Sequence, residues 1–249
     1  MNIGGLQKFS LLDYPDHISA IIFTQGCNFR CHFCYNPMLV WPRKELGKFN
    51  IKPSAKAGEK IEKVDPEITE DDLFDFLEKR QKKLDAVVIS GGEPTIHADL
   101  PEMIERIKAL GFKVKLDTNG TNPRMLKALI AKKLLDYIAM DIKGGLSNYD
   151  LITEVQPNIR DIKKSIKQIM ESDLPYEFRT TVVPELVGKK DIEETGKIIA
   201  GARKWYLQGF KSNMDLLNDR FKNVAGFTAQ DMERMRKIGA EYVEYCGVR

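Results

Sequence analysis

The chain has 249 residues, of which 43% are hydrophobic, enough for one sizeable core in one large domain. Lys and Arg exceed Asp and Glu by 39 − 36 = 3, an excess too small to indicate nucleic acid as the main partner. No stretch approaches the roughly 18 apolar residues that a membrane span requires, and residues 1–5 lack the basic and apolar parts of a signal peptide. The sequence therefore predicts a soluble, cytoplasmic protein without a membrane partner.

Short apolar runs alternate with amphipathic stretches along most of the chain. The predicted strands are residues 18–24, 86–90, 113–118, 137–141, 177–182 and 205–208. The predicted helices cover about residues 70–83, 100–110, 124–133, 159–171, 192–204 and 229–238. Three of these helices begin with a capping pattern, in which Thr or Asp precedes an acidic residue by three positions: Thr69 with Asp72, Asp191 with Glu194, and Thr228 with Asp231.

Alternating strands and helices of this kind build a parallel sheet with helices outside, either as a β/α barrel or as an open α/β fold. Six strands indicate a partial (β/α)6 barrel, open on one side, in a single domain that spans residues 1–249. A lysine-rich stretch with no sustained periodicity interrupts the pattern at about 42–66. We interpret it as a basic loop insertion, which is either without function or a docking surface for a partner protein.

Three of the four cysteines lie within eight residues, with the spacing C-x3-C-x2-C: Cys27, Cys31 and Cys34. Cytoplasmic thiols stay reduced, so clustered cysteines favour metal binding or catalysis over disulfides. Three thiolates are one short of the four that close a [4Fe–4S] cluster, which leaves one iron open to a small molecule. A zinc site completed by His32 is the alternative, although a histidine between two of the cysteines makes tetrahedral geometry awkward.

The other unusual motifs fall where the remaining predicted strands end. They are Ser90-Gly91-Gly92-Glu93-Pro94, Asp117-Thr118-Asn119-Gly120, Asp141-Ile142-Lys143, residues 179–183 and Gln208. Functional residues of a β/α barrel come from these carboxyl-end loops, so six segments are expected to converge on one rim. Taken alone, the glycine pairs would be ordinary turns, and Asp141 with Lys143 a plain surface salt bridge. His17, His97 and Cys246 are interpreted as incidental or packed side chains.

The segment Cys27-x3-Cys31-x-Phe33-Cys34 resembles the cysteine motif of the radical S-adenosylmethionine enzymes. Most of the chain shares this resemblance, apart from residues 42–66 and the C-terminal end. The resemblance is strongest to the activases of glycyl radical enzymes. Among them, residues 5–15 and 23–31 are similar to anaerobic ribonucleoside-triphosphate reductase activating proteins. Activases commonly carry Cys-His-Asn-Pro where this chain has Cys34-Tyr35-Asn36-Pro37.

The resemblance implies a site for a [4Fe–4S] cluster and S-adenosylmethionine. Cys27, Cys31 and Cys34 would bind three irons, and the amino and carboxylate groups of S-adenosylmethionine would bind the fourth. The residues implied in cofactor binding are Phe33, Asn36, Gly91, Gly92, Glu93, Asp117, Thr118, Asp141, Lys143, Arg179, Thr181 and Gln208. A monovalent cation is also expected, because Asp117, Thr118, Asp141 and the Ala139 carbonyl match positions that hold one in formate-lyase activases.

Several of these implied roles have a physical rationale. Gly91 and Gly92 have no side chains, so their backbone can approach the methionine amino group, and Glu93 would brace that loop. Phe33 would place its backbone near the adenine. Asp141 and Lys143 would bind the ribose and carboxylate region.

The implied activity is that of an oxidoreductase: one electron cleaves S-adenosylmethionine into methionine and a 5′-deoxyadenosyl radical, which removes hydrogen from a glycine Cα of a partner enzyme. The implied partner is anaerobic ribonucleotide reductase, with flavodoxin or ferredoxin as electron donor. One alternative is another radical enzyme, either an activase of the pyruvate formate-lyase type or a catalyst that acts on a small molecule. A second alternative is a non-catalytic interaction module that binds a metal.

Overall fold

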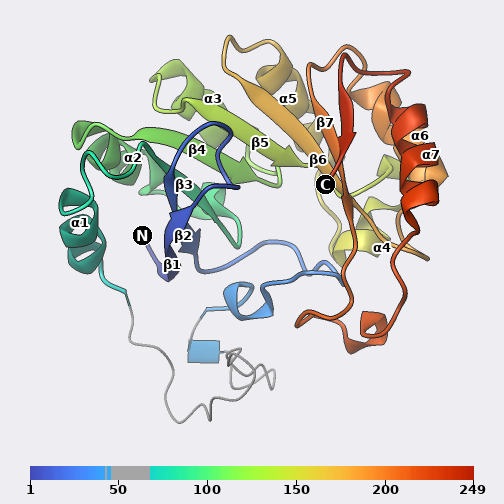
Figure 1. Cartoon of the computed structure of the whole chain (residues 1–249), viewed down its shortest axis with the longest axis horizontal. Helices are drawn as coiled ribbons and strands as arrows, with labels where there is room; N and C mark the ends of the chain where they lie inside the picture. The colour runs from blue at the N-terminus through green and yellow to red at the C-terminus, as the bar shows by residue number, and fades with distance from the viewer. Residues whose placement is uncertain (43, 46–67) are drawn as a thin grey trace. The chain divides into compact units, whose positions relative to one another are not determined.

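The computed structural model describes residues 1–42, 44–45 and 68–249 (Figure 1). Almost all of the predicted insertion at 42–66 lies outside the described residues. The strands are hydrogen-bonded in chain order, from β1 to β8, in a mostly parallel α/β sheet that is not closed. The chain divides into two compact units, here called unit 1 (Met1–Asn28 and Asn36–Lys115) and unit 2 (Phe29–Tyr35 and Leu116–Arg249).

Unit 1 is built on β1 (Ile3–Ser10), β2 (Ser19–Thr24) and β3 (Ala86–Gly91). The first strand runs antiparallel to β2, and β2 runs parallel to β3, with Thr24 paired with Gly91 at their carboxyl ends. Apolar residues dominate β2 and β3 and are almost fully buried, as expected for strands of a parallel sheet that is covered on both faces. The helices of this unit are α1 (Glu70–Glu78) and α2 (Leu100–Ala109).

Unit 2 is built on four strands that pair in parallel: β5 (Tyr137–Asp141), β6 (Tyr176–Val182), β7 (Trp205–Gly209) and β8 (Cys246–Val248). Its helices are α3 (Pro123–Ala131), α4 (Tyr149–Thr153), α5 (Ile159–Met170), α6 (Lys189–Ile198) and α7 (Ala229–Gly239). Trp205 is fully buried, and its indole N–H donates to Thr180 Oγ1 at 3.1 Å. The remaining strand, β4 (Lys113–Thr118), begins in unit 1 and ends in unit 2.

The six predicted strands are all present, with bounds that differ by one residue at most. The predicted number of strands was nevertheless wrong, because β1 and β8 were missed. β1 carries two glycines and a mostly part-exposed surface, and β8 has only three residues, so neither shows a clear strand pattern. The α/β class and the open sheet are confirmed.

Two of the three predicted helix starts are confirmed. Thr69 Oγ1 accepts the N–H of Asp72 at 3.1 Å, and Thr228 Oγ1 accepts that of Asp231 at 3.2 Å. The third was wrong, because α6 begins at Lys189 and Asp191 therefore lies inside it, where its carboxylate accepts the N–H of Gly188 at 2.9 Å. A capping side chain accepts an N–H of the first turn, and an acidic residue three positions later accepts the N–H of the capping residue. Aspartate suits both positions, so the sequence pattern does not distinguish them.

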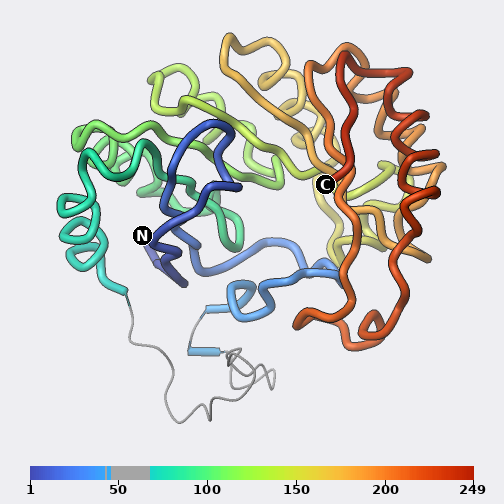
Figure 2. Tube along the Cα trace, viewed as in Figure 1, coloured from blue at the N-terminus to red at the C-terminus, as the bar shows by residue number. Residues whose placement is uncertain are grey.

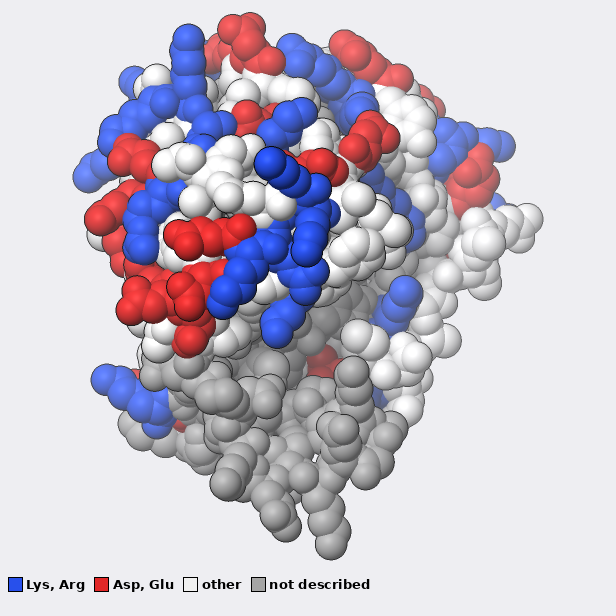
Figure 3. Space-filling model, turned by 60° about the vertical axis from the view of Figure 1, so that its left-hand side comes forward, with Lys and Arg blue, Asp and Glu red and all other residues white. Residues whose placement is uncertain are grey.

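The described surface has a mixed charge character. Acidic and basic side chains are interspersed over the described part of the face in Figure 3, in agreement with the small net charge. Within the described ranges, no helix is both long enough and apolar enough to cross a membrane.

Candidate functional site

The Cys27 segment of unit 1 is held by main-chain hydrogen bonds. Directly after β2, the N–H of Gly26 donates to the carbonyl of Leu39 at 2.7 Å, and that of Cys27 donates to Val40 at 3.0 Å. The motif that follows β3 lies against the same segment, since Glu93 N–H donates to the Gly26 carbonyl at 2.9 Å. Two of the predicted segments are therefore together in unit 1.

Gly91 and Gly92 are required by this close approach. A Cβ on Gly92 would lie 1.9 Å from the Gly26 oxygen, and one on Gly91 would lie 2.2 Å from the Thr24 nitrogen. Gly91 also has φ = +117°, a conformation that side chains other than hydrogen disfavour. Backbone packing, of Gly91 against the end of β2 and of Gly92 against Gly26, thus explains both glycines without a ligand. An ordinary turn does not account for this pair, because close backbone contacts leave no room for a side chain at either position.

Glu93 braces its own turn, as predicted. Its side chain is almost fully buried and accepts the N–H of Thr95 at 3.1 Å together with the Thr95 hydroxyl. Asn36, also in unit 1, is exposed and precedes a 3-10 turn (Pro37–Leu39), where its carbonyl accepts the N–H of Leu39 at 2.9 Å.

Cys31 and Cys34 belong to unit 2, in the segment Phe29–Tyr35. Cys31 is buried, Cys34 is half-buried, and Cys34 N–H donates to the Cys31 carbonyl at 3.0 Å. Phe33 between them is buried. At the start of the segment, Arg30 N–H donates to the Thr153 carbonyl at the end of α4, at 2.9 Å.

The four charged residues among the predicted positions on or directly after β4, β5 and β6 form one network in unit 2. Arg179 Nε donates to Asp141 Oδ1 at 2.8 Å, and its Nη1 donates to Asp117 Oδ2 at 3.2 Å. Lys143 Nζ lies 3.3 Å from Asp141 Oδ2. The salt bridge considered as the plain alternative for Asp141 and Lys143 is present, but it is part of this larger network.

The network explains the ionisation of its members. Burial alone would raise the pKa of Asp141, but the charges of Arg179 and Lys143 outweigh burial and hold that pKa below its ordinary value. Burial alone would lower the pKa of Arg179, but Asp117 and Asp141 raise it. Both groups are therefore charged over the whole ordinary pH range. The positive charge between the two carboxylates is Arg179, and the expected monovalent cation stays a prediction.

The remaining predicted residues lie on β4, β6 and β7. Thr118 is buried and its Oγ1 accepts the N–H of Gly120 at 3.1 Å. Thr181 and Gln208 are half-buried register partners on β6 and β7. Tyr149 was missed by sequence reasoning: its buried hydroxyl accepts the N–H of Lys143 at 3.1 Å, and burial raises its pKa. No local sequence pattern marks Tyr149, because α4, which it begins, is too short to show a helical periodicity.

The chemistry of the cysteine segment fits an iron–sulfur cluster. Cys27, Cys31 and Cys34 would supply three sulfur ligands, and none of them forms a disulfide. Among the described residues, no three or more His, Cys, Asp or Glu side chains stand together as a ready metal site. Both ring nitrogens of His32 have partners, with Asn218 Nδ2 2.8 Å from Nδ1 and Glu154 Oε1 3.5 Å from Nε2, so a zinc site would have to break these contacts.

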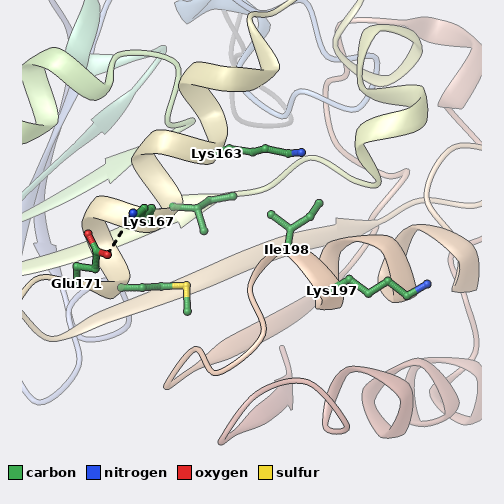
Figure 4. A pocket seen from close by; sticks show the side chains of 7 residues that line it. Lys163, Lys167, Glu171, Lys197 and Ile198 are labelled. Carbon is green, nitrogen blue, oxygen red and sulfur yellow. Dashed lines mark ion pairs between the residues drawn. The ribbon is translucent and has the colours of Figure 1, made fainter.

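The predicted site residues include neither the fourth cysteine nor any that line the pocket between α5 and α6. Cys246 is packed, as predicted, and burial raises the pKa of its thiol to about 11. A pocket of about 510 Å³ lies between α5 and α6 (Figure 4) and contains none of the predicted site residues. Its lining residues are Lys163, Ile166, Lys167, Met170, Glu171, Lys197 and Ile198.

An open, mostly parallel α/β sheet, with three cysteines close together in the sequence after the strand β2, is typical of a class of proteins that bind iron–sulfur clusters. The family comparison is more specific. Residues 21–199 match the model of the Radical SAM superfamily, and the chain belongs to this superfamily. Its members are enzymes that use a [4Fe–4S] cluster and S-adenosylmethionine, so these two are the cofactors of this enzyme.

Several relatives in the superfamily are named as glycyl-radical activases, which supports the activase group. The chain is 32% identical over 99% of its length to a Methanocaldococcus jannaschii protein named as a glycyl-radical enzyme activating enzyme, of which it covers 95%. It is 26% identical to the pyruvate formate-lyase-activating enzyme of Staphylococcus epidermidis, over 80% of this chain and 75% of that one. The fold resembles Streptococcus suis SuiB bound to precursor peptide SuiA, with a TM-score of 0.61 at 15% identity, over 91% of this chain and 47% of that one.

Proposed function

We propose that this enzyme activates an anaerobic ribonucleoside-triphosphate reductase by generating a glycyl radical on it. The observation that carries the proposal is the C-x3-C-x2-C segment in a chain that aligns along nearly all its length with a named glycyl-radical enzyme activating enzyme. The resemblance of residues 5–15 and 23–31 to activating proteins of that reductase supports the choice of partner.

The proposed roles follow the two parts of the site. Cys27, Cys31 and Cys34 would hold three irons of the cluster, which leaves one coordination position for S-adenosylmethionine. When bound, the cluster and S-adenosylmethionine together supply reductive cleavage of the sulfonium and hence a radical that can take hydrogen from glycine. Gly91 and Gly92 would fix the loop beside Cys27. Phe33, Asn36 and Glu93 remain proposed members of the cofactor site.

The charged network of unit 2 would hold the polar groups of S-adenosylmethionine. Asp141 is ionised and accepts hydrogen bonds, so it suits the ribose hydroxyls or the amino group. Lys143 and Arg179 carry the positive charge that a carboxylate needs. Asp117 fixes Arg179 through its ion pair, while Thr118, Thr181 and Gln208 supply neutral polar groups at the neighbouring strand ends.

A pyruvate formate-lyase type of partner is the second candidate, and the likeness to the Staphylococcus epidermidis enzyme favours it. Activation of either partner requires a low-potential electron donor to the cluster, and flavodoxin or ferredoxin suits this role. The proposal includes a cytoplasmic location, because none of the four cysteines forms a disulfide and cytoplasmic thiols stay reduced.

The test is anaerobic reconstitution with iron and sulfide, followed by reduction in the presence of S-adenosylmethionine and one of the two candidate partners. We expect 5′-deoxyadenosine and an electron-paramagnetic glycyl signal on the ribonucleotide reductase. A partner variant with alanine at the radical glycine is the control and should give no such signal. A signal on formate-lyase alone would select the second candidate, and 5′-deoxyadenosine without a signal on either partner would contradict the activase function.

A further inference from the structure

In unit 2, a segment far along the sequence from Phe29–Tyr35 lies directly against it. This segment, here called the clamp, is Phe210–Phe221 and follows the end of β7. In Figure 2 it is the orange stretch beside the blue trace of Phe29–Tyr35, and hydrogen bonds join the two. The clamp carries none of the residues that the sequence motifs identify.

The first attachment is at Tyr35, the residue directly after Cys34. Its hydroxyl accepts the N–H of Lys211 at 2.8 Å. Its ring stacks on that of Phe210, with centroids 6.3 Å apart and planes inclined by 15°. A histidine, which activases commonly have here, is shorter than tyrosine, so this bond depends on the residue by which the chain departs from that pattern.

The second attachment is to the main chain of the cysteine segment itself. Leu217 N–H donates to the carbonyl of Cys34 at 3.2 Å, and Asn218 N–H donates to that of His32 at 3.1 Å. These bonds fix the peptide groups on either side of the Phe33–Cys34 pair. They therefore restrain the backbone that carries Cys31 and Cys34 without using the sulfur atoms.

The third attachment is made by side chains around His32. Asn218 Nδ2 lies 2.8 Å from His32 Nδ1, and the His32 ring lies 5.5 Å from that of Phe221. Asn218 Oδ1 meanwhile accepts the N–H of Arg220 at 3.0 Å and starts the 3-10 turn Asp219–Phe221. Asn218 thus joins the fold of the clamp to the cysteine segment through one side chain.

Buried apolar side chains hold the clamp in place. Phe210, Leu216 and Phe221 are 6%, 5% and 2% exposed, whereas Met214 between them is 48% exposed. The contacts to the cysteine segment are therefore anchored at both ends of the clamp. Such anchoring lowers the entropy that the cysteine segment must lose when it binds a cluster.

We propose that the clamp positions Cys31 and Cys34 for the cluster, with Tyr35 and Asn218 as its positioning residues; this rests on the proposed function. The Tyr35 hydroxyl and the Asn218 side chain hold the segment in one conformation before the cluster binds. The same contacts would slow the loss of a bound cluster, because thiols that stay in place favour re-formation of a broken iron–sulfur bond over release of the iron.

The first part of the test uses the protein without cluster and measures amide hydrogen exchange. In Tyr35→Phe the ring remains, but the Lys211 amide loses its acceptor, so its exchange should quicken by roughly 2- to 10-fold, the range expected for one hydrogen bond. Asn218→Ala should quicken exchange in residues 29–35. Tyr245→Phe, at an exposed tyrosine of unit 2, and Asn213→Ala, at an exposed residue of the clamp, are the matched controls and should leave these amides unchanged.

The second part follows iron release from the reconstituted proteins to a ferrous chelator. Both clamp variants should lose iron roughly 2- to 10-fold faster than the unaltered protein and the two controls. Unchanged release with normal cluster content would overturn the proposal, as would unchanged exchange of the Lys211 amide in Tyr35→Phe. If the unaltered protein takes up no iron at all, the proposed function fails instead, while the exchange measurement still tests the clamp.

Discussion

In unit 1 the candidate site is held mainly by main-chain contacts: Gly92 approaches the Gly26 carbonyl, Gly91 approaches the end of β2, and Cys27 N–H donates to Val40. In unit 2 it is made of charged side chains, where Arg179 joins Asp117 and Asp141. Backbone packing depends on atomic volume and is insensitive to pH, whereas an ion network tolerates small shifts but depends on ionisation. The two parts should therefore respond to different perturbations.

The largest effect is expected from Gly92→Ala. The added methyl group would lie 1.9 Å from the Gly26 oxygen, and neither backbone can move without disturbing the Cys27 segment. We expect the free energy of unfolding to fall by about 3 kcal/mol and cluster uptake to be lost. Urea denaturation and iron content measure the two effects.

Gly5→Ala is the matched control in the same unit, because its new methyl group would meet only ordinary contacts at 3.7 Å or more. It should retain both stability and iron. Equal stability of the two alanine variants would show that backbone packing does not shape this part of the site.

The second-largest effect is expected from Arg179→Met in unit 2. The substitution leaves Asp117 and Asp141 without their shared guanidinium, so we expect a loss of about 2 kcal/mol in the free energy of unfolding at pH 7. Arg236→Met, which breaks an exposed pair with Glu233 on α7, is the control and should have no measurable effect.

The pH dependence of that loss tests its cause. The folded protein holds the pKa of Asp141 below its ordinary value, so the ion pair stabilises the fold above the pKa of the unfolded chain, about 4. This stability disappears as the pH falls through the lower folded pKa. The difference between Arg179→Met and the unaltered protein should therefore shrink between pH 5 and pH 3, and a constant difference would point to packing instead.

The smallest effect is expected from thiol alkylation at Cys246, which lies outside both parts of the site. With a pKa of about 11, only about 0.1% of it is thiolate at pH 8. Iodoacetamide should leave it essentially unmodified in the folded protein at that pH, and modification should rise as the pH approaches 11. Peptide mass spectrometry measures this, and rapid labelling of Cys246 at pH 8 would contradict the packed role.

Much of the fold is predictable because its signals are local. Apolar runs identify β2 to β7, and the motifs at their ends include Asp141 and Arg179, which the sheet register brings together. The cysteine spacing alone points to a cluster with one open iron. The clamp is different, because nothing near Asn218 in the sequence indicates a contact 186 residues away at His32. The need for glycine at position 92 could not be predicted from the sequence either, because it depends on where the Gly26 carbonyl lies.

The most direct test of the account is electron paramagnetic resonance of the reduced, reconstituted protein before and after addition of S-adenosylmethionine, with iron and sulfide counted. The account predicts about four irons per chain and a cluster signal that changes when S-adenosylmethionine binds the open iron. Cys246→Ala should behave the same way, and Cys27→Ala, Cys31→Ala or Cys34→Ala should lose the signal. A signal that S-adenosylmethionine leaves unchanged, or one that survives the loss of any of these three thiols, would contradict it.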